Sequence, residues 1–82
     1  MNWIVYILEC ADGSLYTGIT NDLERRMRAH ASGTGAKYTK RRGPFTVRYT
    51  ESLDSKGAAL QREAAIKSLD RTAKMALLAA RP

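Results

Sequence analysis

The sequence predicts an α+β fold built from three strands and three helices in one domain of 82 residues. Two short runs rich in β-branched and aromatic residues flank an Asp-Gly pair, which is typical of a β-hairpin. A third run, residues 45–50, alternates in polarity as a half-buried strand does. Capping residues and apolar spacings of three and four in the remaining segments indicate helices.

The length of the hairpin loop decides which side chains share a face of the sheet. Strands are expected over residues 3–10 and 14–19. A two-residue Asp-Gly turn would place Tyr6 and Tyr16 on opposite faces, because a shift of one residue in register turns every side chain over. A three-residue loop that ends on a left-handed Gly13 places both phenols on one face. We expect this loop, because glycine at its third position is what the turn needs.

The first helix is expected to begin after Asn21, whose side chain can cap it, with Glu24 reaching back as in a capping box. It should run to about Ser32 and stop at Gly33, which suits a left-handed helix end. Polar groups on an inward stripe must find partners inside the protein or on a ligand. The stripe defined by spacings of three and four holds Leu23, Arg26, Met27 and His30.

Two further helices are expected in the C-terminal part of the chain. One should start at Asp54 or Ser55 and run through Leu69. The other, capped by Asp70, should extend over residues 71–80. Its apolar residues that should cover the core are Met75, Leu77 and Leu78.

Positive charge is concentrated in the middle of the chain, within a net charge of +6. Residues 1–23 hold three acidic and no basic side chains, whereas residues 24–48 hold eight basic side chains and one acidic. A predicted loop over 33–44, with room for one helical turn near 37–41, contains half of these basic groups. Such a segment indicates a phosphate-binding surface. The alternatives are a solvated face that only aids solubility, and a membrane surface, for which interleaved bulky apolar residues are lacking.

The composition also bears on the compartment. The single cysteine, Cys10, cannot form an internal disulfide, and we expect it to be a small buried hydrophobe in the first strand. The apolar run over residues 3–8 follows no basic residue and is too short for a secretory signal. No run approaches the roughly 18 residues needed to cross a bilayer. We therefore expect a cytoplasmic protein that meets no membrane.

Gly18 and Glu63 are hard to explain by folding alone. Glycine inside a strand marks either a bulge or a close approach by another group. Beside Tyr16 it leaves bare backbone where a phosphate or a neighbouring side chain can fit. Glu63 lies among apolar residues of a predicted helix, and a buried carboxylate needs a cation, either Arg26 or a metal. The alternative is a side chain at the margin of the apolar stripe, paired with Lys67. Its apolar neighbours one turn away are Ala59, Leu60 and Ile66.

Arg26 and His30 lie one helical turn apart on the inward stripe of the first helix. An inward arginine needs an anionic partner, either a carboxylate or a substrate phosphate. A lone histidine is more often structural than catalytic. Here its neighbour one turn away is an arginine rather than an acid, so no obvious ion pair explains it.

Taken in order, these residues resemble the GIY-YIG nuclease superfamily, most closely its small stand-alone YhbQ-like group (UPF0213). The likeness extends from Trp3 to Leu78, and the ordered set is specific although no single piece is. Val5 and Ile7 stand where the family name has Gly and Tyr, and Ile19 stands where some members have a lysine. The matching pieces are Val5-Tyr6-Ile7, Tyr16-Thr17-Gly18, Asn21 through Arg26, His30 and Glu63.

The resemblance implies a three-stranded antiparallel sheet flanked by helices, and hydrolysis of nucleic-acid phosphodiester bonds. We expect the nucleic acid to be DNA rather than RNA. The resemblance also implies one divalent ion, Mg²⁺ or Mn²⁺, with Glu63 as its only protein ligand. By position, Tyr16 would help to activate the attacking water, with Tyr6 beside it. Arg26 would hold the scissile phosphate, and His30 would lie near the nucleophile.

The flanking phosphates would be gripped by basic side chains, which gives affinity without much sequence preference. Two other functions stay open at this point: a nucleic-acid-binding module of the same fold that is catalytically weak or inactive, and a basic protein–protein adaptor. A small domain of this kind can also need a protein partner for specificity. The residues expected to bind nucleic acid are Arg25, Lys37, Lys40, Arg41, Arg42 and Lys67.

Overall fold

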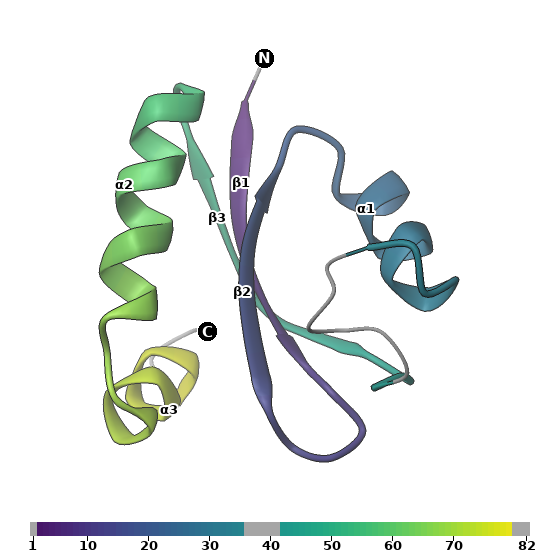
Figure 1. The fold of residues 1–82 in the computed structure, drawn as a ribbon. Coiled ribbons are helices and arrows are strands. Elements are labelled where there is room, and N and C mark those ends of the chain that lie inside the picture. The colour runs from purple at the N-terminus through teal and green to yellow at the C-terminus, as the bar shows by residue number, and fades with distance from the viewer. Residues whose placement is uncertain (1, 36–41, 80–82) are drawn as a thin grey trace.

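The computed structural model describes residues 2–35 and 42–79. Helices cover both faces of a small sheet, with α2 and α3 on one side and α1 on the other (Figure 1). This is the expected α+β architecture. The elements in chain order are β1 (Trp3–Glu9), β2 (Leu15–Thr20), α1 (Leu23–Ala31), β3 (Thr46–Leu53), α2 (Lys56–Lys67) and α3 (Arg71–Ala79).

The three strands form an antiparallel sheet in the order β2-β1-β3, so that β2 and β3 are its edges. The hairpin has the three-residue loop: the Cys10 amide donates to the Ser14 carbonyl at 2.8 Å, and Gly13 is left-handed with φ +84°. Tyr6 therefore lies opposite Gly18. The expected register is confirmed, and it puts Tyr6 and Tyr16 on the same face of the sheet.

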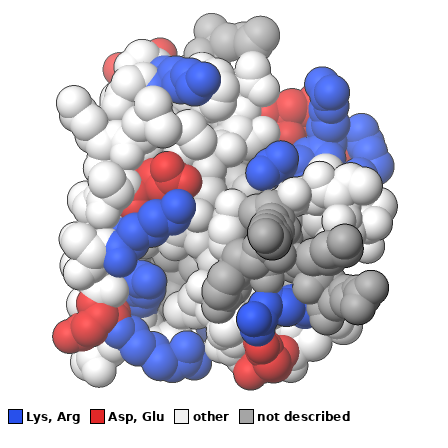
Figure 2. All heavy atoms as spheres, in the orientation of Figure 1, with Lys and Arg blue, Asp and Glu red and all other residues white. Residues whose placement is uncertain are grey.

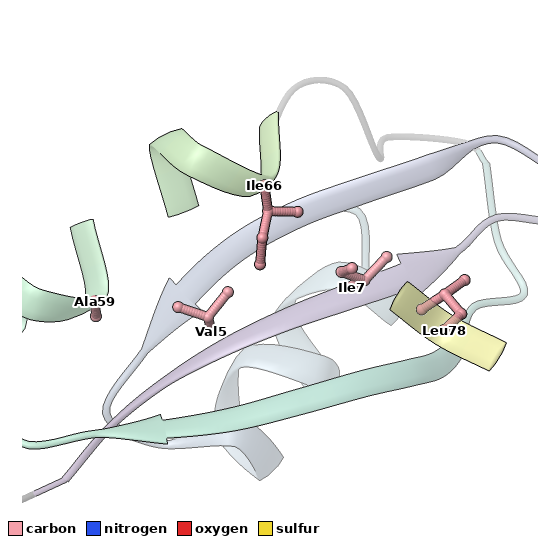
Figure 3. Packing of buried hydrophobic residues seen from close by; sticks show 5 residues of the cluster. All are labelled: Val5, Ile7, Ala59, Ile66 and Leu78. Carbon is pink, nitrogen blue, oxygen red and sulfur yellow. The ribbon is translucent and has the colours of Figure 1, made fainter. Parts of the chain in front are cut away.

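The hydrophobic core lies between the sheet and helices α2 and α3 (Figure 3). Val5 and Ile7, alternate residues of the central strand, are fully buried there. Burial of one such side chain stabilises the fold by about 1.5–3 kcal/mol. Cys10 is also buried, as expected, whereas Met75 is exposed and does not cover the core. The helix residues that complete this cluster are Ala59, Ile66 and Leu78.

The start of α1 differs from the prediction by one residue. Asp22, not Asn21, is the cap, and its carboxylate accepts the Arg25 amide. The physical reason is that the Thr20 hydroxyl already accepts the Asp22 amide at 3.0 Å, which holds residues 20–22 in a turn before the helix begins. Glu24 does not reach back but pairs with Arg28 one turn on. The helix ends as expected at a left-handed Gly33, φ +82°.

Several other expected boundaries were also wrong. The two hairpin strands were expected over 3–10 and 14–19 but cover 3–9 and 15–20, and the third strand starts at 46 rather than 45. Strand β3 continues past Thr50 to Leu53, because it pairs with the central strand as far as Trp3. Helix α2 ends at Lys67, before Leu69, where the Ser68 hydroxyl turns back to a helix carbonyl. Ser55 caps α2 and Asp70 caps α3, as expected. The helical turn expected near 37–41 lies outside the described residues.

Candidate active site

Four of the predicted site residues meet on the face of the sheet that α1 covers. Tyr6 comes from the central strand and Tyr16 from the edge strand β2, and the hairpin register turns both toward α1. Arg26 and His30 come from the inward stripe of α1, and His30 is 1% exposed. Because the two helix residues are one turn apart, they approach the same pair of phenols.

The Tyr6 hydroxyl is the centre of this group. It lies 2.9 Å from Nε2 of His30 and accepts a hydrogen bond from Nε of Arg26 at 3.4 Å. A guanidinium can only donate, so the hydroxyl is the acceptor of the Arg26 bond. In the second bond either the phenol or Nε2 of His30 can be the donor, depending on the tautomer of the imidazole. The tyrosine side chain is fully buried, and its hydroxyl is committed to these two partners.

Burial sets the charge state of the cluster. Desolvation raises the pKa of Tyr6 above its ordinary value, despite the opposing hydrogen bond from Arg26. Desolvation and then the Arg26 charge lower the pKa of His30. The pKa of Arg26 is raised, first by its hydrogen bond to Tyr6 and to a lesser degree by Tyr16. At neutral pH the cluster therefore consists of a neutral phenol, a neutral imidazole and one guanidinium cation.

Tyr16 completes the group from the edge of the sheet. Its ring centroid lies 5.4 Å from that of His30, in an edge-on arrangement, and 6.4 Å from that of Tyr6, with the two ring planes tilted. Unlike Tyr6, it is partly exposed. Gly18 permits this packing, since a Cβ there would lie 2.6 Å from the Tyr6 hydroxyl and 3.1 Å from the Tyr16 ring. The glycine marks a close approach, and β1 and β2 pair without a bulge beside it.

Replacing Gly18 by alanine should disturb both phenols at once. The backbone at Gly18 is not left-handed, so the cost comes from the added methyl group rather than from strain. Overpacking of this kind costs about 1–3 kcal/mol in the free energy of unfolding. Urea denaturation measures the loss. Gly57→Ala is the control, because its Cβ would meet only the Ser55 hydroxyl at 3.9 Å. Equal stability of Gly18→Ala and the wild type would contradict the close packing.

Glu63 does not join the four residues by direct contact. It belongs to α2, which covers the other face of the sheet and packs on the edge strand β2. Its side chain is 19% exposed and pairs with Lys67 at 3.4 Å. Its charge is the smallest of the causes that raise the pKa of Tyr6. The pairing with Arg26 weighed from the sequence is absent from the described residues.

The position of Glu63 explains why its burial is only partial. Ala59 and Ile66 are fully buried, as expected for the inner stripe of α2. Leu60, however, is 46% exposed, so the apolar stripe is narrower than the sequence predicts. Glu63 therefore stands at the margin of the stripe rather than inside it, where a carboxylate can face both the protein and a solvated ligand.

The basic residues are distributed on both sides of the edge strand. Figure 2 shows basic side chains over α2 on one side and over α1 on the other, with a largely uncharged surface over β2 between them. Arg25 and Arg26 line a hollow of about 260 Å³ with residues of the β2–α1 turn. Arg42 pairs with Asp12 at 2.6 Å, and Lys67 with Glu63. Lys37, Lys40 and Arg41 lie outside the described residues.

Sequence reasoning missed two residues that pack on the cluster. The Phe45 ring meets the His30 imidazole edge-on, with centroids 5.9 Å apart. Gly35 lies against the same imidazole, since a Cβ there would be 2.5 Å from Nδ1. One feature of the sequence could have indicated this contact. Gly33 is sufficient to end the helix, so Gly35, two residues later, is not explained by the same turn.

Two features are absent from the described part of the chain. No group of three or more His, Cys, Asp and Glu side chains gathers there in a way that could hold a metal ion. None of the helices described is long and apolar enough to cross a membrane.

Comparison with known proteins gives one consistent family. Residues 2–76 match the family model described as the GIY-YIG catalytic domain. A UPF0213 protein of Halobacterium salinarum is 55% identical over 73 residues, which are 89% of this chain and 95% of that protein.

Two solved structures agree with this match. The solution NMR structure of a UPF0213 protein from Bacillus halodurans superposes with a TM-score of 0.66 at 51% identity, covering 99% of this chain and 86% of that one. An NMR structure of an E. faecalis protein gives 0.65 at 42% identity, covering 94% and 83%. With a matching family model, a matching fold and half-identical relatives, the chain belongs to the GIY-YIG superfamily of nuclease-type domains, in its UPF0213 group.

Proposed function

We propose that this protein is a divalent-metal-dependent endonuclease that hydrolyses nucleic-acid phosphodiester bonds, with DNA rather than RNA as its substrate, at the Tyr6–Tyr16–Arg26–His30 cluster. The observation that carries the proposal is the Tyr6 hydroxyl, buried and shared between a guanidinium and an imidazole. A structural tyrosine needs one partner for its hydroxyl. Two polar partners from α1, with a second phenol alongside, form a group that can hold an anion and organise a proton.

The geometry supports different roles for the two phenols. Tyr6 is inaccessible and keeps its proton, because burial raises its pKa, so it positions Arg26 and His30. Tyr16 is partly exposed at the edge strand and is the phenol that a water molecule can reach. In hydrolysis the water oxygen forms a bond to phosphorus while one P–O ester bond breaks. Tyr16 in its phenolate form would take the water's proton, and a solvent water would protonate the departing oxygen.

Arg26 is suited to hold the phosphate under attack. Its Nε donates to Tyr6, and Arg26 also lines the hollow shared with Arg25. A guanidinium provides paired donors that match phosphate oxygens. The exposed Arg25, with Arg42 and Lys67 farther out, would contact flanking phosphates and give affinity with little sequence preference. We also keep the cytoplasm as the proposed location, on the strength of the single buried cysteine.

Glu63 would hold the metal ion, Mg²⁺ or Mn²⁺. A single carboxylate fits Mg²⁺, which keeps several waters and uses substrate phosphates to complete its shell. The ion would neutralise charge that develops on the phosphoryl oxygens and acidify bound water. Glu63 stands at the margin of α2, partly exposed, with Lys67 as its present partner. When a metal ion binds Glu63, Lys67 is released from this ion pair and can contact a phosphate instead.

The test of this function is a cleavage screen of the purified protein over branched, flapped and single-stranded DNA and RNA, with and without Mg²⁺ or Mn²⁺. Metal-dependent nicking, abolished by a chelator, is the expected result. Binding that weakens steeply with salt, without cleavage of any substrate, would favour the second function, a nucleic-acid-binding module that has lost turnover. The observation that favours this second function is the Glu63–Lys67 ion pair, which neutralises the one proposed metal ligand.

Stability should depend on the charge state of His30. Because its pKa is lowered in the folded protein, the unfolded chain binds more protons between the lowered value and the ordinary value of about 6.5. The stabilisation is therefore complete above about pH 6.5 and lost as the pH falls through that window. Urea denaturation at a series of pH values measures this, and His30→Gln should show a smaller loss. An identical loss in both proteins would contradict a neutral, buried imidazole.

A further inference from the structure

His30 is 1% exposed, and four neighbours among the described residues surround its imidazole. The rings of Tyr6, Tyr16 and Phe45 lie with centroids 5.9, 5.4 and 5.9 Å from it. The fourth neighbour is the backbone of Gly35. A Cβ at that position would be 2.5 Å from Nδ1 and 3.0 Å from both Cε1 and Cγ. Real Cβ atoms do not make contacts this short with a ring, so only glycine lets the chain pass here.

The backbone does not account for this glycine. Gly33, two residues earlier, is left-handed and ends α1, and a Cβ there would meet nothing within 4 Å. Gly35 is the reverse case, because its backbone is not left-handed and its neighbour is a side chain. The two glycines therefore have separate physical reasons: Gly33 serves the turn, and Gly35 serves the imidazole.

We propose that Gly35 is a positioning residue for the nuclease site: its bare backbone holds the His30 ring so that Nε2 stays on the Tyr6 hydroxyl. The proposal rests on the proposed function for its effect on cleavage, but not for its effect on His30. Any side chain at Gly35 must push the ring away at the Nδ1 side. The displaced ring then loses its alignment with Tyr6, and with it the support that holds Tyr6 against Arg26.

The experiment is an NMR titration of His30 in Gly35→Ala and wild type, using tag-free protein. His30 is the only histidine in the chain, so its ring signals need no assignment by mutation. In the wild type we expect a lowered pKa and one dominant ring tautomer. In Gly35→Ala the pKa should rise toward the ordinary value of about 6.5, and the ring should exchange between tautomers.

Gly33→Ala is the matched control. It adds the same methyl group two residues away and strains a left-handed backbone, but it puts nothing near the imidazole. We expect it to lower stability and to leave the His30 titration unchanged. If Gly35→Ala does not fold, the double variant Gly35→Ala/His30→Ala decides, because removing the ring removes the clash. A folded double variant supports the proposal, whereas an unfolded one beside a folded His30→Ala overturns it.

Cleavage provides the functional readout. The single-turnover rate of Gly35→Ala should fall by about tenfold to a hundredfold, as expected for a catalytic group displaced by about 1 Å. In a His30→Ala background the same substitution should cost little more. A His30 titration in Gly35→Ala identical to that of the wild type would overturn the proposal. If the wild type cleaves nothing, the proposed function fails, but the titration still decides whether Gly35 positions the ring.

Discussion

Replacing Tyr16 by phenylalanine is expected to reduce the single-turnover cleavage rate by about a hundredfold or more, with little change in binding or stability. Proton transfer by a positioned side chain contributes about 10²–10⁴ to a rate. Tyr6 cannot take over this role, because its hydroxyl is buried and held by Arg26 and His30. The partly exposed Tyr16 is therefore the phenol whose hydroxyl the reaction needs.

Tyr49→Phe is the matched control for Tyr16→Phe. It removes a phenolic hydroxyl from the opposite face of the sheet, where that hydroxyl donates to Glu51 at 2.6 Å. We expect a small loss of stability, about 1 kcal/mol, and an unchanged cleavage rate. Single-turnover assays with protein in excess separate the chemical step from product release. A Tyr16→Phe variant that cleaves at the rate of the wild type would remove this phenol from the mechanism.

Glu63→Gln should have an effect at least as large. The substitution keeps the size of the side chain and removes the charge that a divalent ion requires. We expect the metal-dependent rate to fall by about a thousandfold, because charge stabilisation at the phosphoryl oxygens is lost with the ion. Binding to nucleic acid in the absence of metal should stay the same or become tighter, since Lys67 loses its partner and remains free to contact phosphate.

Glu24→Gln is the control for Glu63→Gln. Glu24 also pairs with a basic residue one helical turn away, but its side chain is 85% exposed on α1. Neutralising it changes the net charge by the same amount and leaves the cluster untouched. Cleavage should be unaffected. If both variants lost the same amount of activity, the effect of Glu63→Gln would be one of overall charge and not of metal binding.

The sequence predicted the hairpin more closely than it predicted the helix ends. Glycine at the third position of Ala-Asp-Gly favours the three-residue loop over the two-residue turn, and that loop determined the register and the shared face of the two phenols. The cap of α1 was one residue off, because the Thr20 hydroxyl competes for the local amide groups, a contact that residue preferences do not include. The end of β3 depends on pairing with β1, a long-range effect that local alternation cannot reveal.

For the site, the sequence predicted which residues of α1 face inward, but it did not predict every residue that contacts them. The spacing of Arg26 and His30 was sufficient to place them together, and the hairpin supplied Tyr6 and Tyr16. The partner of Glu63 was left open, because an i,i+4 lysine and a distant arginine satisfy the same rule. Gly35 and Phe45 were missed, since their contact with His30 depends on how the chain returns after α1.

The most direct measurement is the single-turnover rate of Mg²⁺-dependent cleavage by four proteins purified in parallel: wild type, Tyr16→Phe, Glu63→Gln and the double variant. Residues that act as one catalytic unit are not additive, so the double variant should be about as slow as the slower single variant. The wild type should exceed all three by at least about a hundredfold. Equal cleavage by all four proteins, or salt-sensitive binding with no cleavage by any, would contradict the assignment of this cluster as a nuclease site.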